Sequence, residues 1–430
     1  MCLAVNQPSA VPCPVGLEYL PYQLEGIEFA RGRNAVLFGA EPGLGKTIQA
    51  IGWLNCHPQT ETLLVVCPAS LKINWRRELD KWLISPCVDV TIINYDVLHK
   101  LDMTRHWDVC IIDEAHAVKN RKAKRTVLCK QIQADVKLAL TGTPILNKPV
   151  ELWSILNWLA PDIWPKSSFM RYAYRYCGAY QGKWGMVMDG ATHLDELRMH
   201  LSYLMTRHLK ADVLKQLPPK RRQIIEISKD GLSADLRARL AEATRSIERI
   251  EDTYKDDASA LESALSVAWQ DMAELRHEVG LAKVDACLDL IHDAIESSGK
   301  VIVFAHHRDV IAALNDALVD YMPAVIHGDI PVLARQDAVD RFQTDDECKV
   351  FIGQIQAAGV GLTLTASSHV IFVELDWTPG IVSQAEDRAH RIGQRDSVLV
   401  QHVVMEGGFD ARMVKALVRK QTVIEKALDA

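Results

Sequence analysis

Short apolar runs alternate with helical stretches over the first third of the chain. The runs are NAVLF (34–38), TLLVV (62–66), VTII (90–93), DVCII (108–112) and VKLAL (136–140). Strands of a parallel sheet are short and apolar throughout, because helices cover both faces of such a sheet. The pattern therefore predicts an α/β domain over residues 1–160.

A second series of apolar runs begins after Gly299. Its members are KVIVF (300–304), AVIH (324–327), KVFIG (349–353), HVIFVEL (369–375) and VLVQHVV (398–404). The same argument predicts a second α/β domain over residues 299–430. The expected fold class is therefore α/β, with two parallel-sheet domains and a mainly helical insertion between them.

The stretch between the two series lacks this rhythm. Residues 161–227 are basic and rich in aromatic side chains, whereas residues 228–298 are acidic and have a composition typical of helices. At the end of the acidic segment, apolar side chains recur at steps of three and four and stop before Gly299, as in an amphipathic helix that ends at glycine. These side chains are Leu281, Val284, Leu288, Ile291 and Ile295.

Composition narrows the class of protein. With 48% hydrophobic and 24% charged residues, the chain has the balance of a soluble globular protein. No apolar stretch reaches the roughly 20 residues of a membrane span, and the N-terminus lacks the features of a signal peptide. The ten cysteines include no C-x-x-C pair, which argues against a disulfide framework or a structural zinc site. We therefore expect a cytoplasmic protein with no membrane partner.

Charge is distributed unevenly along the chain, whose formal net charge is -6. Residues 228–280 carry twelve acidic and seven basic side chains, whereas residues 166–222 carry eleven basic and four acidic ones. The basic stretch also holds Phe169, Tyr172, Tyr174, Tyr176, Tyr180, Trp184 and Tyr203. Such a stretch can neutralise phosphates and stack on sugars or bases. The alternative, a solvated face with buried aromatic rings, is equally compatible with the sequence.

A phosphate-binding loop follows the first apolar run. Gly43, Gly45, Lys46 and Thr47 stand between NAVLF and a helical stretch, and this strand, loop and helix order is the one a P-loop requires. Backbone N–H groups of the glycine-rich turn would surround phosphate oxygens, Lys46 would reach the outer phosphates, and Thr47 would offer its hydroxyl to Mg²⁺. The first glycine of the motif is replaced by Ala40.

Two carboxylates follow the run DVCII. Asp113 and Glu114 are expected at the carboxyl end of a strand, where ligands of α/β sheets collect. Asp113 is suited to hold Mg²⁺, and Glu114 is suited to orient or deprotonate an attacking water. A pair of surface carboxylates is the alternative, but its place after a P-loop favours the catalytic interpretation.

Two further sequence blocks indicate the class of enzyme. Thr141-Gly142-Thr143-Pro144 follows a strand of the first domain, and the block QAEDRAHRIGQ (384–394) lies in the second. Arg388 and Arg391 share one helical face and could act as arginine fingers on a phosphoryl-transfer transition state. The alternative role is a helix-surface salt bridge with Glu386 or Asp387.

Taken in order, these blocks resemble the motifs of superfamily-two helicase-like ATPases. The DEAHAVKN (113–120) and DRAHRIGQ (387–394) blocks look like those of Snf/Swi remodelling translocases. The annealing-helicase, HARP-like branch is similar in four further blocks: RYCGAYQGKWG (175–185), TRHLKADVLKQLPPK (206–220), VFAHHRDV (303–310) and VELDWTPG (373–380).

The resemblance implies two RecA-like domains that face each other across an ATP cleft, with ATP and Mg²⁺ as cofactors. Gln23 would recognise the adenine, and Gln384, Arg388 and Arg391 would complete the site from the second domain. Segment 161–227 would be a protrusion, and the helix around Lys420 would be a brace. DNA contacts would come from loops that follow strands: Pro68, Ser70, Asn94, Tyr95, His306, Gly361, Thr363 and Trp377.

The leading hypothesis is a monomeric ATP-dependent translocase on double-stranded or branched DNA, which remodels, migrates or anneals strands. One alternative is a strand-separating helicase on DNA or RNA, for which no wedge is visible in the sequence. The other is an ATP-gated DNA-binding scaffold with weak turnover. A motor this short with no chromatin-reading module points to a bacterium or its virus as the source.

Overall fold

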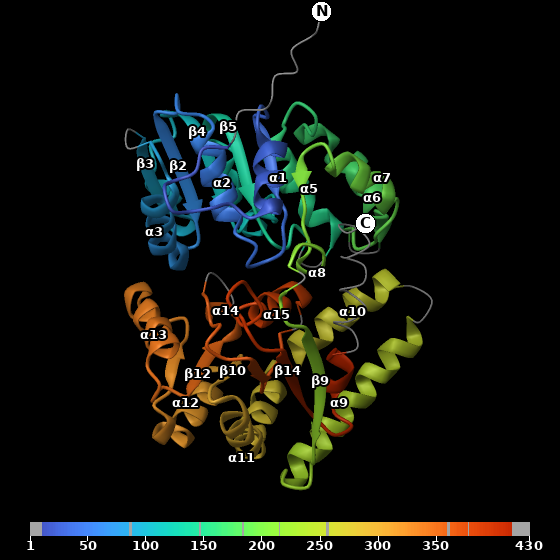
Figure 1. Cartoon of the computed structure of the whole chain (residues 1–430). Coiled ribbons are helices and arrows are strands. Elements are labelled where there is room, and N and C mark those ends of the chain that lie inside the picture. Colours follow the sequence, from blue (N-terminus) through green and yellow to red (C-terminus); the bar gives the residue numbers. More distant parts are fainter. Residues whose placement is uncertain are drawn as a thin grey trace, which may run out of the picture. The chain divides into compact units, whose positions relative to one another are not determined.

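The computed structural model describes residues 11–414 except 86–87, 146–147, 183–184, 215, 255–257, 359–361 and 377. The chain divides into two compact units (Figure 1). Unit 1 comprises Met1–Pro144, Ser154–Pro165 and His200–Val213, and unit 2 comprises Ile145–Trp153, Lys166–Met199 and Leu214–Ala430.

Unit 1 is built on a six-stranded parallel sheet with the strand order β3-β2-β4-β5-β1-β8. Its strands are β1 Ala35–Phe38, β2 Thr62–Cys67, β3 Asp89–Asn94, β4 His106–Asp113, β5 Gln133–Leu140 and β8 Met205–Thr206. Its helices are α1 Pro21–Ala30, α2 Lys46–Asn55, α3 Lys72–Trp82, α4 Lys124–Cys129 and α8 Lys210–Val213, with 3₁₀ turns η1 Ala69–Leu71, η2 Tyr95–Lys100 and η3 Ala115–Val118. All five strands predicted from the first apolar series are confirmed.

Unit 2 contains a second six-stranded parallel sheet, with the strand order β11-β12-β10-β13-β14-β9. Its strands are β9 Lys220–Ile227, β10 Val301–Ala305, β11 Ala324–Ile326, β12 Val350–Gln354, β13 His369–Phe372 and β14 Val398–Met405. Its helices include α12 Arg308–Ala317, α13 Val332–Thr344, α14 Ile355–Ala358 and α15 Pro379–Glu386, with the 3₁₀ turn η6 Val319–Tyr321. The second predicted α/β series is confirmed as well.

The basic segment between the two series contributes an edge strand to each sheet, β8 to the first and β9 to the second. Its other elements are α6 Phe169–Tyr176, α7 Leu194–Leu201, the turn η5 Lys166–Ser168 and an antiparallel pair, β6 Tyr180–Gly182 and β7 Gly185–Val187. Helix α5 Leu152–Leu159 and the turn η4 Pro149–Glu151 precede it. Strand β9 thus lies in the second sheet, although residues 220–227 fall within the segment 161–227 that was expected to form the protrusion.

The acidic segment is helical, as its composition predicts. It forms α9 Ala234–Thr253, α10 Ala258–Asp271 and α11 Ala273–Ser298, and Gly299 ends α11 with a positive φ of 76°. The predicted apolar face of α11 is correct for Val284 and Ile291, which pack against the second sheet with Cys287. It is wrong for Leu281, which is exposed although the helix period places it within about 20° of Leu288, which packs against the same core.

Apolar side chains of the strands form the core around each sheet, as the strand composition predicts. Every residue of β10 is buried, and the Phe304 and Phe372 rings pack with their centroids 5.1 Å apart, tilted by 30°, within one core cluster. The cysteines of the described residues are free, and most of them are buried small core residues. None of the described helices is long and apolar enough to cross a membrane.

Candidate active site

The P-loop has the backbone geometry that its sequence predicts. Gly43 and Gly45 adopt left-handed φ values of 88° and 73°, and Gly45 caps the N-terminus of α2. The Lys46 Nζ donates to the carbonyl oxygens of Ala40 at 2.8 Å and Glu41 at 3.3 Å. Lys46 is therefore folded over the loop whose amides and helix N-terminus would surround a phosphate.

Ala40 replaces a glycine without cost to the loop. Its side chain is fully buried, and its φ is not positive, so the position does not need the conformational freedom of glycine. The glycine that the loop does need lies opposite, since a Cβ on Gly142 would approach the Pro42 ring to 2.6 Å. The segment LTGTP (140–144), called the LTGTP block below, thus packs directly on the P-loop.

Gln23 is buried against the P-loop. Its Oε1 accepts from the Leu20 N–H at 3.0 Å, and its Nε2 donates to the Leu44 carbonyl at 3.4 Å. A Cβ at Gly45 would approach the Gln23 Nε2 to 2.5 Å, so this turn admits only glycine. The structure therefore places Gln23 at the phosphate loop, where its role toward adenine stays a prediction.

Asp113 ends β4 in a buried position and carries two hydrogen bonds through its carboxylate. The Trp75 Nε1 donates to Oδ2 at 2.8 Å, and the Glu114 N–H donates to Oδ1 at 2.8 Å. Burial and the neighbouring Glu114 carboxylate raise the pKa of Asp113 to about 7, against the lowering effect of the Trp75 N–H and of Lys46. A nearby cation would therefore stabilise the ionised form.

Glu114 adopts a left-handed conformation with a φ of 50°, which is uncommon for a residue with a side chain. Its Oε2 lies 3.3 Å from the His116 Nδ1, and the same nitrogen lies 3.2 Å from the Thr141 hydroxyl. Strain of this kind accumulates at functional sites. His116 therefore links the carboxylate pair to the LTGTP block.

Thr47 and Asp113 together suit Mg²⁺ because a hydroxyl and a carboxylate are hard oxygen ligands. No group of three or more His, Cys, Asp or Glu side chains that could hold a metal occurs within the part of the chain that the structure describes. A cation that takes its remaining ligands from phosphate oxygens and water needs only such a sparse protein set.

Two residues that contact the segment between β1 and the P-loop were not predicted from the sequence. The Arg207 Nη1 donates to the Gly39 carbonyl at 2.7 Å, and the Lys210 N–H donates to the Glu41 carboxylate at 2.5 Å. Strand β8 places both residues there by pairing with β1. The TRHLK block was visible in the sequence, but its partner strand was not.

In unit 2, Gln384 and Arg388 are buried at the end of α15 and just beyond it. The Arg388 Nη1 donates to the Leu362 carbonyl at 3.2 Å, and the Arg391 Nη1 donates to the same oxygen at 2.7 Å. Both guanidinium groups therefore converge on the loop that follows β12 and α14. The structure brings the two side chains together, but not on one helical face as predicted, because α15 ends at Glu386 and both arginines lie in the turns that follow it.

Glu386 is a buried carboxylate at the centre of an ion cluster. It accepts from the Lys220 Nζ at 2.8 Å and from the Arg222 Nε and Nη2 at 2.9 and 2.6 Å, and His402 lies 3.4 Å away. Burial alone would raise the pKa of Glu386, but Lys220, His402 and Arg222 hold it well below its ordinary value. Lys220 and Arg222 are therefore ion-paired within unit 2, although the sequence suggested that this basic stretch contacts phosphate.

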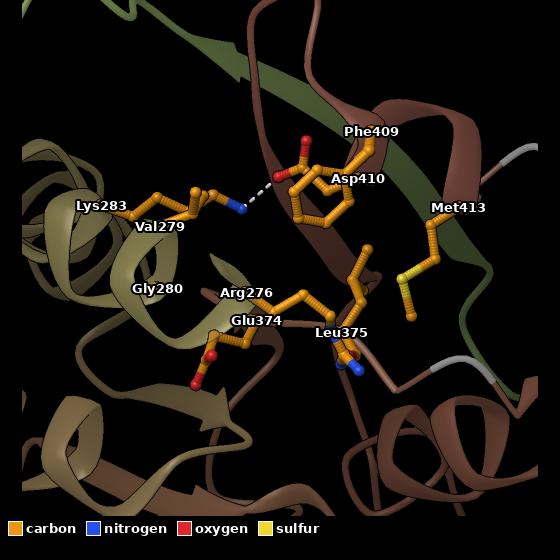
Figure 2. A pocket seen from close by; sticks show the side chains of 9 residues that line it. All are labelled: Arg276, Val279, Gly280, Lys283, Glu374, Leu375, Phe409, Asp410 and Met413. Atoms are coloured by element: carbon orange, nitrogen blue, oxygen red, sulfur yellow. Dashed lines mark hydrogen bonds and ion pairs between the residues drawn. The ribbon is translucent and has the colours of Figure 1, made fainter. Parts of the chain in front are cut away.

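A small pocket adjoins α11 in the same unit (Figure 2). On one wall the Lys283 Nζ donates to Asp410 Oδ2 at 2.5 Å and to the Val403 carbonyl at 2.9 Å. On another, Glu374 accepts from the backbone N–H groups of His306 and His307. The lining residues are Arg276, Val279, Gly280, Lys283, Glu374, Leu375, Phe409, Asp410 and Met413.

The residues expected to contact DNA differ in how exposed their side chains are. Pro68, Ser70 and Asn94 are half-buried at the ends of β2 and β3, and Thr363 is exposed. Tyr95 is buried, and its hydroxyl donates to the Asp113 carbonyl at 2.7 Å. His306 is half-buried and held by Glu374. Gly361, Trp377 and the expected brace around Lys420 lie outside the described residues.

The aromatic side chains of the basic segment divide between core and surface. Phe169, Tyr172 and Tyr176 are buried, and the Tyr172 hydroxyl donates to the Pro149 carbonyl at 2.8 Å. Tyr174 and Tyr203 are exposed, with fractions of 56% and 70%. Tyr180 is exposed as well, and Trp184 lies outside the described residues. Core packing therefore explains about half of the set.

Comparison with known proteins identifies the family. A model of the SNF2-related domain matches residues 22–100 and 87–270, and a model of the helicase conserved C-terminal domain matches residues 282–393. The chain belongs to the SNF2-related helicase family. This membership and the two parallel sheets confirm the predicted fold of two RecA-like domains.

Two animal proteins are similar to this chain over nearly its whole length. The Bos taurus protein named DNA annealing helicase and endonuclease ZRANB3 is 35% identical over 455 residues, which cover 97% of this chain and 41% of the relative. The Xenopus tropicalis SWI/SNF-related matrix-associated actin-dependent regulator of chromatin subfamily A-like protein 1 is 33% identical over 446 residues, which cover 97% and 46%. The chain thus spans less than half the length of these relatives, which confirm its resemblance to the annealing-helicase branch.

Among solved structures, the Sulfolobus solfataricus SWI2/SNF2 ATPase core in complex with dsDNA aligns with 96% of this chain and 97% of its own. The sequence identity is 22% and the TM-score is 0.43.

The Asp113 carboxylate should make the metal-free protein less stable as the pH rises. The folded-state pKa of about 7 lies above the ordinary value of 3.8, so the folded state holds an extra proton between these values and loses stability as pH increases through them. Asp113→Asn should therefore be more stable than the parent at pH 8 without Mg²⁺, by on the order of 2–4 kcal/mol. Thermal unfolding from pH 4 to pH 8 measures this gain, and a constant difference across that range would contradict it.

Lys220→Ala should destabilise unit 2 more than Arg221→Ala does. Side chains alternate along β9, so Lys220 and Arg222 share the face that meets Glu386, and Arg221 lies on the other, exposed face. Removing one partner of a buried pair costs about 3 kcal/mol, whereas an exposed charge costs less than about 1 kcal/mol. Urea unfolding measures both variants, and equal midpoints would show that the ion cluster contributes nothing.

Proposed function

We propose that this protein is an ATP-dependent translocase on double-stranded or branched DNA, and that ATP hydrolysis drives steps along the backbone. The observation that carries the proposal is the convergence of Lys46, Asp113 and Glu114 on the P-loop edge of one sheet, in a chain of the SNF2-related helicase family. These residues supply a phosphate anchor, a metal ligand and a base or orienting group for water.

Remodelling, branch migration or strand annealing is the form of activity that we infer. Support comes from the relatives, one of which is named a DNA annealing helicase and endonuclease. The annealing-helicase blocks at residues 175–185 and 206–220 carry the same resemblance within the sequence. Strand separation and an ATP-gated scaffold are the outcomes that the experiments below distinguish from translocation.

Family membership suggests a role for each domain and for the loops. We infer that the first domain binds Mg²⁺-ATP, that Gln384, Arg388 and Arg391 complete the site from the second domain, and that the cleft between them closes on ATP. The basic segment and the loops after β2, β3, β10 and α14 would bind DNA. The motor would act as a monomer. The animal relatives give no support to the bacterial or viral origin expected from the sequence.

Variants of the two sets of motif residues separate chemistry from binding. Lys46→Ala and Glu114→Gln should lower ATP turnover by about 10²-fold or more, while the protein stays folded, because each removes a group that acts on the reacting phosphate or water. Arg388→Ala and Arg391→Ala should lower turnover by about 10³-fold and spare ATP binding. Steady-state ATPase assays and titration of a fluorescent ATP analogue measure both. Parallel losses of binding and turnover in the arginine variants would assign them to the pocket instead.

Nucleic acid should control the ATPase rate. Because a translocase is completed by the DNA that bridges its domains, duplex or forked DNA should raise ATP turnover by about tenfold or more. The stimulation should fall steeply with salt, since phosphate contacts dominate such binding. ATPase assays with duplex, forked and single-stranded DNA and with RNA test this. A rate indifferent to all four would leave the scaffold, and selective stimulation by RNA would favour an RNA helicase.

A further inference from the structure

Three neighbouring strands of the first sheet end at the same level. Each leads into a segment with a proposed role in DNA binding or in ATP hydrolysis. Strand β2 lies between β3 and β4, with Cys67 opposite Asn94 and Val66 opposite Ile112. The loop after β2 and the turn after β3 carry proposed DNA contacts, and β4 ends in Asp113. The topology thus places the loop after β2 on the strand next to the one that ends in Asp113, and the turn after β3 one strand further along.

A continuous helical segment joins the proposed DNA loop after β2 to that carboxylate. Pro68 caps the turn η1, and η1 runs without interruption into α3. Trp75 lies in the first turn of α3, is fully buried, and donates its indole N–H to Asp113 Oδ2 at 2.8 Å. The Pro68 loop is therefore connected through α3 to the donor that orients the carboxylate.

A second connection joins the turn after β3 to the same residue. Tyr95 directly follows Asn94, is buried, and donates its hydroxyl to the Asp113 carbonyl at 2.7 Å. Two loops of separate strands therefore hold Asp113 by its side chain and its backbone. Hydrogen bonds depend steeply on distance and angle, so small loop shifts change how the carboxylate is held.

We propose that Trp75 and Tyr95 are positioning residues that transmit DNA contact at the loops after β2 and β3 to the Asp113 carboxylate. The inference rests on the proposed function, because it requires that these loops touch DNA and that Asp113 serves hydrolysis. It adds a route by which DNA raises the ATPase rate within the first domain. Neither residue touches nucleotide or metal in this role.

The test compares three conservative variants. Trp75→Phe removes the indole N–H and keeps an aromatic ring, and Tyr95→Phe removes only the hydroxyl. The matched control is Trp82→Phe on the same helix, because the Trp82 Nε1 is buried without a hydrogen-bond partner among the described residues. Thermal unfolding of all three variants confirms that each is folded.

Four quantities are measured for each variant: affinity for a labelled DNA duplex, affinity for a fluorescent ATP analogue with Mg²⁺, ATPase rate without DNA, and ATPase rate at saturating DNA. Trp75→Phe and Tyr95→Phe should each lose about tenfold in the ratio of the DNA-stimulated rate to the DNA-free rate, and Trp75→Phe should bind both ligands as the parent does. Trp82→Phe should keep the parent's ratio.

Two results would overturn the inference while leaving the proposed function intact. In the first, DNA stimulates the parent, and Trp75→Phe and Tyr95→Phe keep its ratio. In the second, both variants lose the DNA-free and DNA-stimulated rates in equal proportion, which is the mark of a residue that only supports the site. A parent that no DNA stimulates would refute the proposed function, and this inference would fall with it.

Discussion

The burial of one carboxylate, that of Asp113, is the constraint around which the first domain is organised. A buried carboxylate is costly unless hydrogen bonds and positive charge compensate it. Trp75 and the Glu114 backbone supply two hydrogen bonds, and Lys46 lowers the pKa that burial raises. Helix α3, the left-handed turn at Glu114 and Lys46 at the start of the P-loop helix therefore all act on this one group.

The second domain solves a similar problem with a different carboxylate. Glu386 is buried beside the arginine motif and is held ionised by Lys220 and Arg222 from β9. Strand β9 is the edge strand through which the basic segment enters the second sheet. Helix α15, which carries Gln384 and leads to Arg388, is thereby held against β9. This contact supports the two arginines.

Much of the fold and of the ATP motifs was predictable from sequence because these features are local. Apolar runs become parallel strands, and a P-loop places Lys46 at a helix N-terminus by its own glycines. The roles of Lys220, Arg222 and Tyr95 were not predictable, because each depends on a partner far away in the sequence. From the sequence alone, a basic residue in a basic segment is interpreted as a phosphate contact. The structure instead places Lys220 beside Glu386. The pairing of β8 with β1, which brings Arg207 to the P-loop, is long-range in the same way.

Displacement of a third strand from a DNA triplex measures translocation on duplex DNA most directly, because it needs movement along the duplex without separation of its strands. The third strand should be released by the parent protein with Mg²⁺-ATP. Release should fail with a non-hydrolysable ATP analogue and with Glu114→Gln. A parent that hydrolyses ATP in a DNA-dependent manner but leaves the triplex intact would contradict the account of this chain as a DNA translocase.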